Sequence, residues 1–268
     1  MKLALNQIDL CFVVDTTGSM SPFLSAARMA LVNTLTALGR QSDLDLRVAL
    51  VEYRDHPPQE MSFVTRHYAL TNDFSKTQKV IDGLQASGGG DAPEAVFDGV
   101  HEAAVLTEWR KNSARFILLV GDAPPQGYEA DPRNRRNGRS KENDIEHRRV
   151  CTCGLTLAQV TAAAEENRVI VQALPVQANE LTRTAFTEIA TATGGVCGET
   201  ANADVVIARI ESLLAAEFGS LSLDRLVLET IEKMPEINTE AIAQTINAPR
   251  LRVAASLARL GKRGFLNG

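Results

Sequence analysis

The stretch IDLCFVV at residues 8–14 runs directly into DTTGSM at residues 15–20, and this junction decides the fold. An apolar run that ends in a turn and is followed by helical spacing predicts a buried strand, with Asp15 at its carboxyl end. Asp15, Thr17 and Ser19 alternate, so one extended loop can aim a carboxylate and two hydroxyls at a single point. Such hard oxygen donors suit Mg2+ or Mn2+. Taken alone, the pattern is also typical of a helix cap.

Two further loops favour the metal site over the cap. GGGDAPE at residues 88–94 opens a predicted helix, and its glycines permit close backbone approach. GDAPP at residues 121–125 leaves the predicted buried strand RFILLV at residues 115–120. These loops add Asp91 and Asp122, and sites in open α/β sheets gather outside the carboxyl ends of the strands. Glu94 is interpreted as a favourable charge in the first turn of the helix that follows, in preference to a metal ligand.

The rest of the chain alternates between stretches with the two-residue period of a strand and stretches with the 3.6-residue period of a helix. Strands that alternate with helices predict an α/β fold, a doubly wound and mostly parallel sheet covered on both faces. The strand at 62–70 is predicted to be an antiparallel edge strand. The other predicted strands are 8–14, 44–51, 115–120, 168–176 and 195–197, and the predicted helices are 20–40, 73–85, 93–109, 155–167, 181–193 and 204–218.

Composition sets the broad class of the protein. A chain of 268 residues with 44% hydrophobic residues has room for one sizeable α/β domain and a small appendage. The formal net charge of −5 gives no overall nucleic-acid signature. No secretory signal or membrane-spanning run is visible, and the four cysteines form no disulfide framework. We therefore expect a cytoplasmic protein that does not enter membranes.

These ordered motifs, together with VEYRDHP at residues 51–57, resemble the von Willebrand factor A domain over roughly residues 5 to 217. The amino-acid sequences of the three acidic loops are similar to those of the family branch that includes hemicentin-like and alpha-kinase-associated domains. The resemblance implies a Rossmann-like domain over 1–218 that carries a metal-ion-dependent adhesion site. The implied metal ligands are Asp15, Thr17, Ser19, Asp91 and Asp122.

The resemblance also implies a function. In this family the metal, here expected to be Mg2+ or Mn2+, takes a carboxylate from a partner protein at an open position. The chain is thus expected to be a non-enzymatic adaptor with no catalytic residue. Asp91 departs from the family, because many members carry a threonine there. We expect this extra carboxylate to hold the metal more firmly and to attract an acidic partner less.

Residues 219–268 fall outside that pattern and are expected to form a small helical domain. Three short helical stretches resemble a helix-turn-helix of the winged-helix kind, although the chain has no room for a full wing. A locally basic end, with no acidic neighbours in the sequence, makes a DNA-binding regulator the alternative function. A protein-docking module is the other interpretation. The basic residues are Arg250, Arg252, Arg259, Lys262 and Arg263.

Three further interpretations stay open at this stage. A Mg2+-dependent phosphohydrolase of the haloacid dehalogenase type would need a second carboxylate where Thr17 stands. His147, Cys151 and Cys153 suggest zinc but lack the second spaced pair of a structural site, so we expect the cysteines to dock the following helix. The long polar stretch 126–149 leaves the Asp122 loop and is either a lid beside the metal or a solvated segment.

Overall fold

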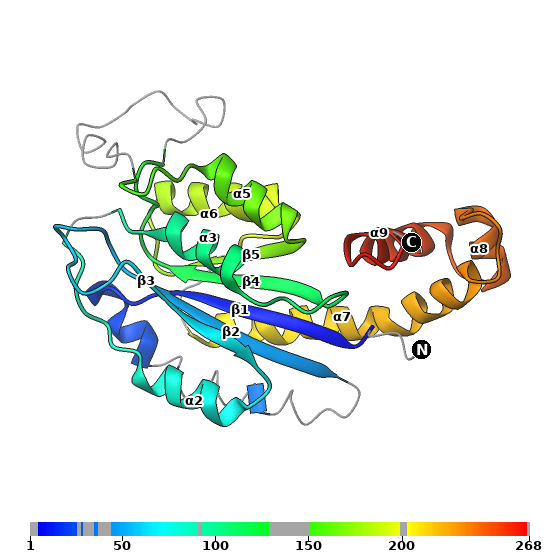
Figure 1. Cartoon of the computed structure of the whole chain (residues 1–268), viewed down its shortest axis with the longest axis horizontal. Helices are drawn as coiled ribbons and strands as arrows, with labels where there is room; N and C mark the ends of the chain where they lie inside the picture. Colours follow the sequence, from blue (N-terminus) through cyan, green and yellow to red (C-terminus); the bar gives the residue numbers. More distant parts are fainter. Residues whose placement is uncertain are drawn as a thin grey trace.

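A five-stranded sheet forms the centre of the molecule (Figure 1). The computed structural model describes residues 5–25, 28, 35–36, 44–90, 93–128, 151–198 and 203–266. The strand order is β3-β2-β1-β4-β5, and only β3 is antiparallel to its neighbour. The strands are β1 (Gln7–Asp15), β2 (Asp45–Tyr53), β3 (Thr65–Thr71), β4 (Ala114–Gly121) and β5 (Val169–Pro175). The predicted doubly wound α/β fold and the antiparallel edge strand are confirmed.

Helices cover both faces of this sheet. Asp73 caps α2 (Phe74–Gly83) by accepting from two backbone N–H groups, and Thr156 begins α5 (Leu157–Glu166) with a capping box. Figure 1 shows α2 on one face, and α3 (Val96–Leu106), α5 and α6 (Glu180–Ala192) on the other. The predicted helix over 20–40 lies largely outside the described residues, and the predicted strand at 195–197 is a single bridge between Ala173 and Cys197.

The period-2 pattern of β1 explains why the sheet has two cores. Leu10 and Phe12 pack into the hydrophobic cluster on the α2 face, whereas Cys11 and Val13 pack into the cluster on the opposite face. All four side chains are at most 3% exposed. Because both faces of the strand are buried, its sequence is a continuous apolar run, as expected of a parallel sheet between two helical layers.

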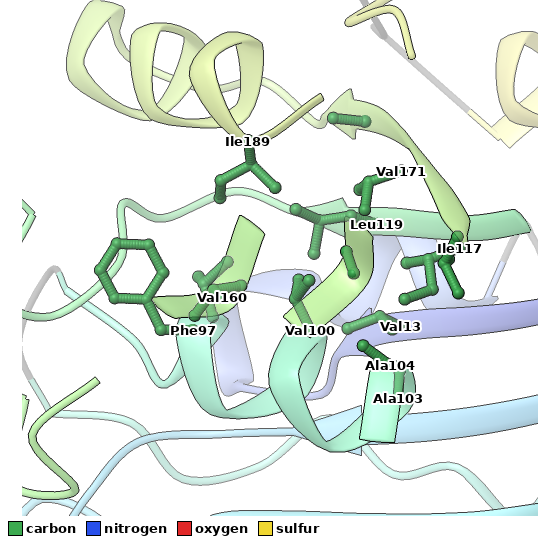
Figure 2. Close-up of a cluster of buried hydrophobic side chains, with 14 of the residues drawn as sticks. Val13, Phe97, Val100, Ala103, Ala104, Ile117, Leu119, Val160, Val171 and Ile189 are labelled. Atoms are coloured by element: carbon green, nitrogen blue, oxygen red, sulfur yellow. The ribbon is translucent and has the colours of Figure 1, made fainter. Parts of the chain in front are cut away.

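The second core fixes α3 on the sheet. Figure 2 shows Val100 and Ala104 of this helix in the same buried cluster as Val13 and Leu119 of the sheet. Gly99 lies against Tyr53, where a Cβ would come within 2.9 Å of the ring. The helix therefore sits close to the strands, and its first turn is held at the carboxyl end of the sheet.

The carboxyl-terminal part of the chain is helical but differs from the predicted pattern. One helix, α7 (Ala203–Ile231), runs without a break through the position where we expected two helices and a domain boundary. It is followed by α8 (Thr239–Thr245) and α9 (Arg250–Lys262). These elements share a third hydrophobic cluster, which includes Leu5, Val227 and Val253. The division into domains 1–218 and 219–268, and the likeness to a winged helix, stay predictions.

Contacts of the basic carboxyl-terminal residues correct one expectation from the sequence. Arg259 forms an ion pair with Asp224 of α7 (2.6 Å), although it has no acidic neighbour in the sequence. Lys262 donates to the carbonyl of Thr193 (2.9 Å), and Arg263 donates to the carbonyl of Leu5 (2.7 Å). These three cations are held by the protein itself, and Figure 1 shows α9 near the end of the sheet where β1 begins.

The sheet topology singles out one place for a binding site. β1 pairs with β2 on one side and with β4 on the other. The chain first adds β2 and β3 on one side of β1 and then crosses over to add β4 and β5 on the other side, so the strand order reverses between β1 and β4. In open α/β sheets, ligands bind outside the carboxyl ends of the strands at this switch point. Among the described residues, none of the helices has both the length and the apolarity to cross a bilayer.

Candidate metal site and its neighbours

The loop after β1 places three oxygen-bearing side chains together. Asp15 Oδ1 accepts hydrogen bonds from the backbone N–H of Thr17 (2.8 Å) and from its hydroxyl (2.6 Å). The Thr17 hydroxyl lies 3.3 Å from that of Ser19. Asp15 and Thr17 are buried, whereas Ser19 is exposed. The cluster therefore opens toward solvent on the side of Ser19.

Asp122 comes to the same point from β4. It follows Gly121, whose backbone packs so closely on Asp15 that a Cβ would lie 3.4 Å from Asp15 Oδ2 and would clash with the hydroxyl of Tyr53. A glycine is therefore required here to let β4 deliver its aspartate beside that of β1. The sequence-predicted residues Asp15, Thr17, Ser19 and Asp122 are thus brought together, whereas Asp91 lies outside the described residues.

Among the described residues, no cation is one of the main causes of the pKa shifts of the two carboxylates. Burial and the charge of Asp122 raise the pKa of Asp15 from 3.8 to about 7, although Thr17 hydrogen bonds oppose the shift. Burial also raises the pKa of Asp122, and the hydroxyl of Ser19 opposes this. Asp15 Oδ2 and Asp122 Oδ1 are buried and accept no well-aligned hydrogen bond among the described residues. Such a cluster has the charge and the free oxygen atoms to bind a divalent cation.

The glycine-rich loop is joined to the first loop by backbone hydrogen bonds. Gly18 N donates to Gly88 O (3.1 Å), and Ser87 N donates to Thr16 O (3.0 Å). Gly88 and Gly89 have φ angles of 76° and 80°, which other residues rarely adopt. This conformation turns the chain beside the first loop, where a Cβ on Gly89 would lie 3.3 Å from Thr17.

Glu94 is placed differently from the sequence interpretation. The helix α3 begins at Val96 with Ala95 as its cap, so Glu94 precedes the helix and is not in its first turn. Its side chain is 4% exposed, and its Oε1 would lie 3.1 Å from a Cβ on Gly89. The charges of Asp15, Asp122 and Glu94, together with burial, raise the pKa of Tyr53 well above its usual value. Glu94 is therefore a further acidic neighbour of the cluster.

A buried polar network behind the loops went unnoticed in the sequence. The hydroxyl of Thr16 donates to Glu52 (3.2 Å) and accepts from Arg54 Nε (3.3 Å). Arg54 also donates to the carbonyl of Gln85 (2.9 Å) and forms an ion pair with Glu60 (3.3 Å). Arg54 thus connects the loop after β1 to the glycine-rich loop. The only signal in the sequence was that charged residues follow directly on the apolar part of β2.

The two remaining sequence interpretations have different outcomes. The stretch 126–149, interpreted as either a lid or a solvated segment, falls mostly outside the described residues, and so does His147. Cys151 and Cys153 were expected to dock the next helix. In the structure both thiols lie close to the imidazole of His56, at 3.6 Å and 3.5 Å, which the prediction did not include. No pattern in the sequence links these cysteines to a histidine that lies so far before them in the chain.

The family of the chain follows from this fold and from a sequence comparison. Residues 9–202 match the model of the von Willebrand factor A domain family. The match covers most of the chain, and the sheet order and helical layers agree with it. The chain therefore belongs to the von Willebrand factor A domain family.

Two curated relatives align with somewhat less than half of the chain. The alpha-protein kinase vwkA of Dictyostelium discoideum is 32% identical over 127 residues, which are 46% of this chain and 19% of that protein. An ariadne-like RING finger protein of Acanthamoeba polyphaga mimivirus is 33% identical over 118 residues, which are 44% of this chain and 11% of that protein. The chain thus matches only a small part of each relative.

Solved structures share the fold at low sequence identity. The pilus adhesin SpaC from Lactobacillus rhamnosus GG has a TM-score of 0.58 and 17% identity, over 79% of this chain and 30% of the adhesin. Proximal thread matrix protein 1 from the mussel byssus, with a zinc-occupied MIDAS motif, has a TM-score of 0.53 and 14% identity. That match covers 78% of this chain and 45% of the mussel protein.

Proposed function

We propose that this protein is a non-enzymatic adaptor that binds a partner protein through a divalent metal ion. The metal would be held by Asp15, Thr17, Ser19 and Asp122, with Asp91 as a further ligand. The observation that carries the proposal is the meeting of the buried carboxylate of Asp15, the half-buried carboxylate of Asp122 and two hydroxyls at the carboxyl ends of β1 and β4. Oxygen atoms of Asp15 and Asp122 there accept no well-aligned hydrogen bond among the described residues.

The donor set favours Mg2+ or Mn2+ within this proposal. All the residues named offer oxygen, which hard cations prefer, and Mg2+ keeps several of its water ligands when bound to protein. Ser19 is exposed, so a water on that side can exchange for a carboxylate of a partner. The mussel protein with a zinc-occupied MIDAS motif supports a divalent ion in this fold, and SpaC is an adhesin.

The proposal includes neither catalysis nor a defined assembly. The metal, when bound, supplies a positive centre for a carboxylate, and the chain orients it through Thr17 and Ser19. All four cysteines are free thiols, which is compatible with the cytoplasmic location that we propose. The relatives include a protein kinase and a RING finger protein, which supports a non-catalytic role beside catalytic domains.

The metal site is tested by titrating Mg2+ and Mn2+ into the protein in a calorimeter. We expect Ser19→Ala to weaken Mg2+ binding about tenfold, equivalent to about 1.4 kcal/mol, because one hydroxyl ligand is lost. Ser21→Ala is the matched control, since Ser21 is also exposed but lies beyond the alternating motif. Equal affinities in the two variants would remove Ser19 from the metal shell.

The open position is tested separately with Mn2+ in the site. Water-proton relaxation is expected to report exchangeable water on the bound ion, and glutarate, as a model carboxylate, is expected to displace that water. Asp122→Asn, which removes one charge of the metal shell, should reduce both signals. A bound Mn2+ without exchangeable water would contradict the proposed mode of partner binding, even if the metal affinity were high.

Asp91 is tested by changing it to the residue that many family members carry. With Asp91, three carboxylates attract the divalent ion and more than neutralise its charge. Asp91→Thr removes one of these attractive charges, so it is expected to weaken Mg2+ binding about tenfold. The same change is expected to tighten the binding of glutarate to the metal-loaded protein, because less negative charge repels it. Unchanged or tighter Mg2+ binding in the variant would rule out Asp91 as a charged ligand.

A further inference from the structure

A second cluster of metal-ligating side chains lies beside the first turn of α3. His56 comes from the loop between β2 and β3, Asp98 from α3, and Cys151 and Cys153 from the segment that leads into α5. One ligand atom from each of the four residues lies within 4.8 Å of the others. None of these residues belongs to the Asp15 cluster, so this is a separate constellation. Figure 1 shows α3 and α5 on the same face of the sheet.

The distances within this cluster are those of a tetrahedron of metal ligands. His56 Nε2 lies 3.1 Å from Asp98 Oδ2, 3.6 Å from Cys151 Sγ and 3.5 Å from Cys153 Sγ. Cys151 Sγ lies 3.4 Å from Asp98 Oδ2. Around a tetrahedral Zn2+, with Zn–S of about 2.3 Å and Zn–N or Zn–O of about 2.0 Å, ligand atoms lie about 3.3–3.8 Å apart. These four distances are therefore close to the spacing that a zinc ion requires, and all four atoms lie within 4.8 Å of one another.

Burial and chemistry favour a metal over a simple polar contact. His56, Asp98 and Cys151 are 1%, 8% and 2% exposed, while Cys153 is exposed. His56 and Asp98 pair with each other (3.1 Å), but the two thiols gathered around this pair are weak hydrogen-bond partners and add little to it. Two thiolates, one imidazole and one carboxylate are, however, ligands that zinc accepts. Magnesium, which prefers oxygen, does not fit this set.

We propose that His56 Nε2, an oxygen of Asp98 and the thiolates of Cys151 and Cys153 bind a structural Zn2+ ion. Four protein ligands fill a tetrahedral shell and leave no position for substrate, which distinguishes this site from a catalytic zinc centre. Binding requires the two thiols to lose their protons to solvent, and His56 must ligate as a neutral imidazole without a proton on the Nε2 atom that faces Asp98, so zinc binding releases protons. The ion does not change oxidation state.

Zinc at this site would brace the loops of the adhesion-type site. Asp55, the neighbour of His56, accepts a hydrogen bond from Gln126 Nε2 (3.2 Å), which lies on the loop after Asp122. The backbone N–H of Ala95, just before α3, donates to the carbonyl of Arg54 (2.8 Å). A metal that ties the segment at 151–153 to α3 and to the β2–β3 loop therefore holds three segments together next to the acidic cluster.

The experiment measures zinc in the full chain after loading with Zn2+ and gel filtration. We expect about one tightly bound zinc ion per chain, released into a colorimetric indicator when a mercurial reagent blocks the thiols. Zinc is expected to be lost in His56→Ala and in Cys151→Ser. It is expected to be retained in Asp15→Asn, which separates this ion from any zinc at the adhesion-type site.

Matched controls identify the ligands. Cys197→Ser and His147→Ala remove a cysteine and a histidine that we do not assign to the site, and both are expected to keep the zinc. Loss of zinc in His147→Ala but not in His56→Ala would overturn the assignment of His56. Retention of zinc in both His56→Ala and Cys151→Ser would overturn the site.

A spectroscopic measurement on the unmutated protein covers the case in which variants fail to fold. Co2+ in place of zinc is expected to show the intense d–d bands of tetrahedral cobalt together with a sulfur-to-cobalt charge-transfer band. A weak octahedral spectrum without the sulfur band, or no stable zinc binding by the wild type, would overturn the proposal. Either result would leave the calorimetric test of Mg2+ binding unaffected.

Discussion

Two buried aspartates at opposite ends of β1 have opposite surroundings. Asp9, near the amino end, accepts from the backbone N–H and the side chain of Arg110 (2.8 and 2.7 Å) and from the hydroxyl of Ser113 (2.7 Å). Asp15, at the carboxyl end, is equally inaccessible to solvent, but its nearest charge is the like charge of Asp122. One carboxylate is paired with an arginine of the protein, whereas the other has no cation partner among the described residues and could be compensated by the metal ion that we propose.

This difference distinguishes a structural charge from a binding charge. A buried ion pair with all its hydrogen bonds made holds elements together, as Arg110 does by also donating to the carbonyls of Ile8 and Asp45. A buried carboxylate without such partners costs stability, and this cost is recovered when a ligand binds. The amino end of the sheet is therefore stabilised by its own ion pairs, whereas the carboxyl end carries the charge that the proposed metal ion would neutralise.

The largest effect is expected at the paired end. Asp9→Ala removes the buried partner of Arg110 and leaves only the partly exposed Asp45 (2.6 Å) as its counter-charge, so it should lower the free energy of unfolding by about 3 kcal/mol. Urea denaturation with and without Mg2+ measures this, and the loss should be the same in both. Lys76→Ala, which breaks an exposed pair, should leave the free energy of unfolding unchanged within error. A similar small effect for Asp9→Ala would erase the contrast.

The opposite result is expected at the unpaired end. Asp15→Asn keeps an oxygen for the two Thr17 hydrogen bonds but removes the charge beside Asp122. In EDTA we expect it to raise the free energy of unfolding, on the order of 2 kcal/mol, and to abolish the stabilisation by Mg2+. Thermal unfolding with EDTA, Mg2+, Mn2+ and Ca2+ measures both. A variant that is as destabilised in EDTA as Asp9→Ala would show that Asp15 is structural.

The pH dependence sharpens the same comparison. In the metal-free protein the pKa of Asp15 rises from 3.8 to about 7, so the folded state holds this proton more tightly than the unfolded chain does. The stability contributed by this group is fully present below about pH 4 and is lost as the pH rises through 7. The difference between wild type and Asp15→Asn in EDTA should therefore widen between pH 5 and pH 8.

The stabilisation by Mg2+ should depend on the same ionisation of Asp15. Mg2+ competes with the proton on Asp15, so the gain in melting temperature from Mg2+ is expected to be larger at pH 8 than at pH 5.5. Differential scanning calorimetry at a fixed Mg2+ concentration measures it. A gain that does not change over this range would mean that Asp15 is already ionised without metal.

The smallest effect is expected where α9 meets the amino end of the sheet. Lys262→Met removes a hydrogen bond to the carbonyl of Thr193 and should cost about 0.5–1.5 kcal/mol. Arg252→Met, on an exposed position of the same helix, should leave stability unchanged. If α9 instead served DNA binding, Lys262→Met would reduce retention on DNA at low salt without any loss of stability.

Local patterns in the chain were sufficient to predict the sheet, its antiparallel edge strand and the loops after β1 and β4. A strand that is buried on both faces has a recognisable apolar run, and the residue after it must lie at the edge of the sheet. The meeting of Asp15 with Asp122 therefore followed once β1 and β4 were predicted to be parallel strands of one sheet. The wrong placement of Glu94 arose because its backbone pairs with the segment after β4, where Glu94 N donates to Pro124 O (2.9 Å) and Gln126 N donates to Glu94 O (2.9 Å), and no local pattern shows such a distant pairing.

Other features were decided only by the tertiary structure. His56, Asp98, Cys151 and Cys153 come from three segments, and Cys151 lies 95 positions after the histidine that it contacts. Arg259 finds Asp224 only because α9 packs back on α7. Sequence periodicity reports which face of an element is buried but not which distant side chain will face it. That choice depends on how the sheet order and the helix layers bring remote segments together, so no local pattern could show it.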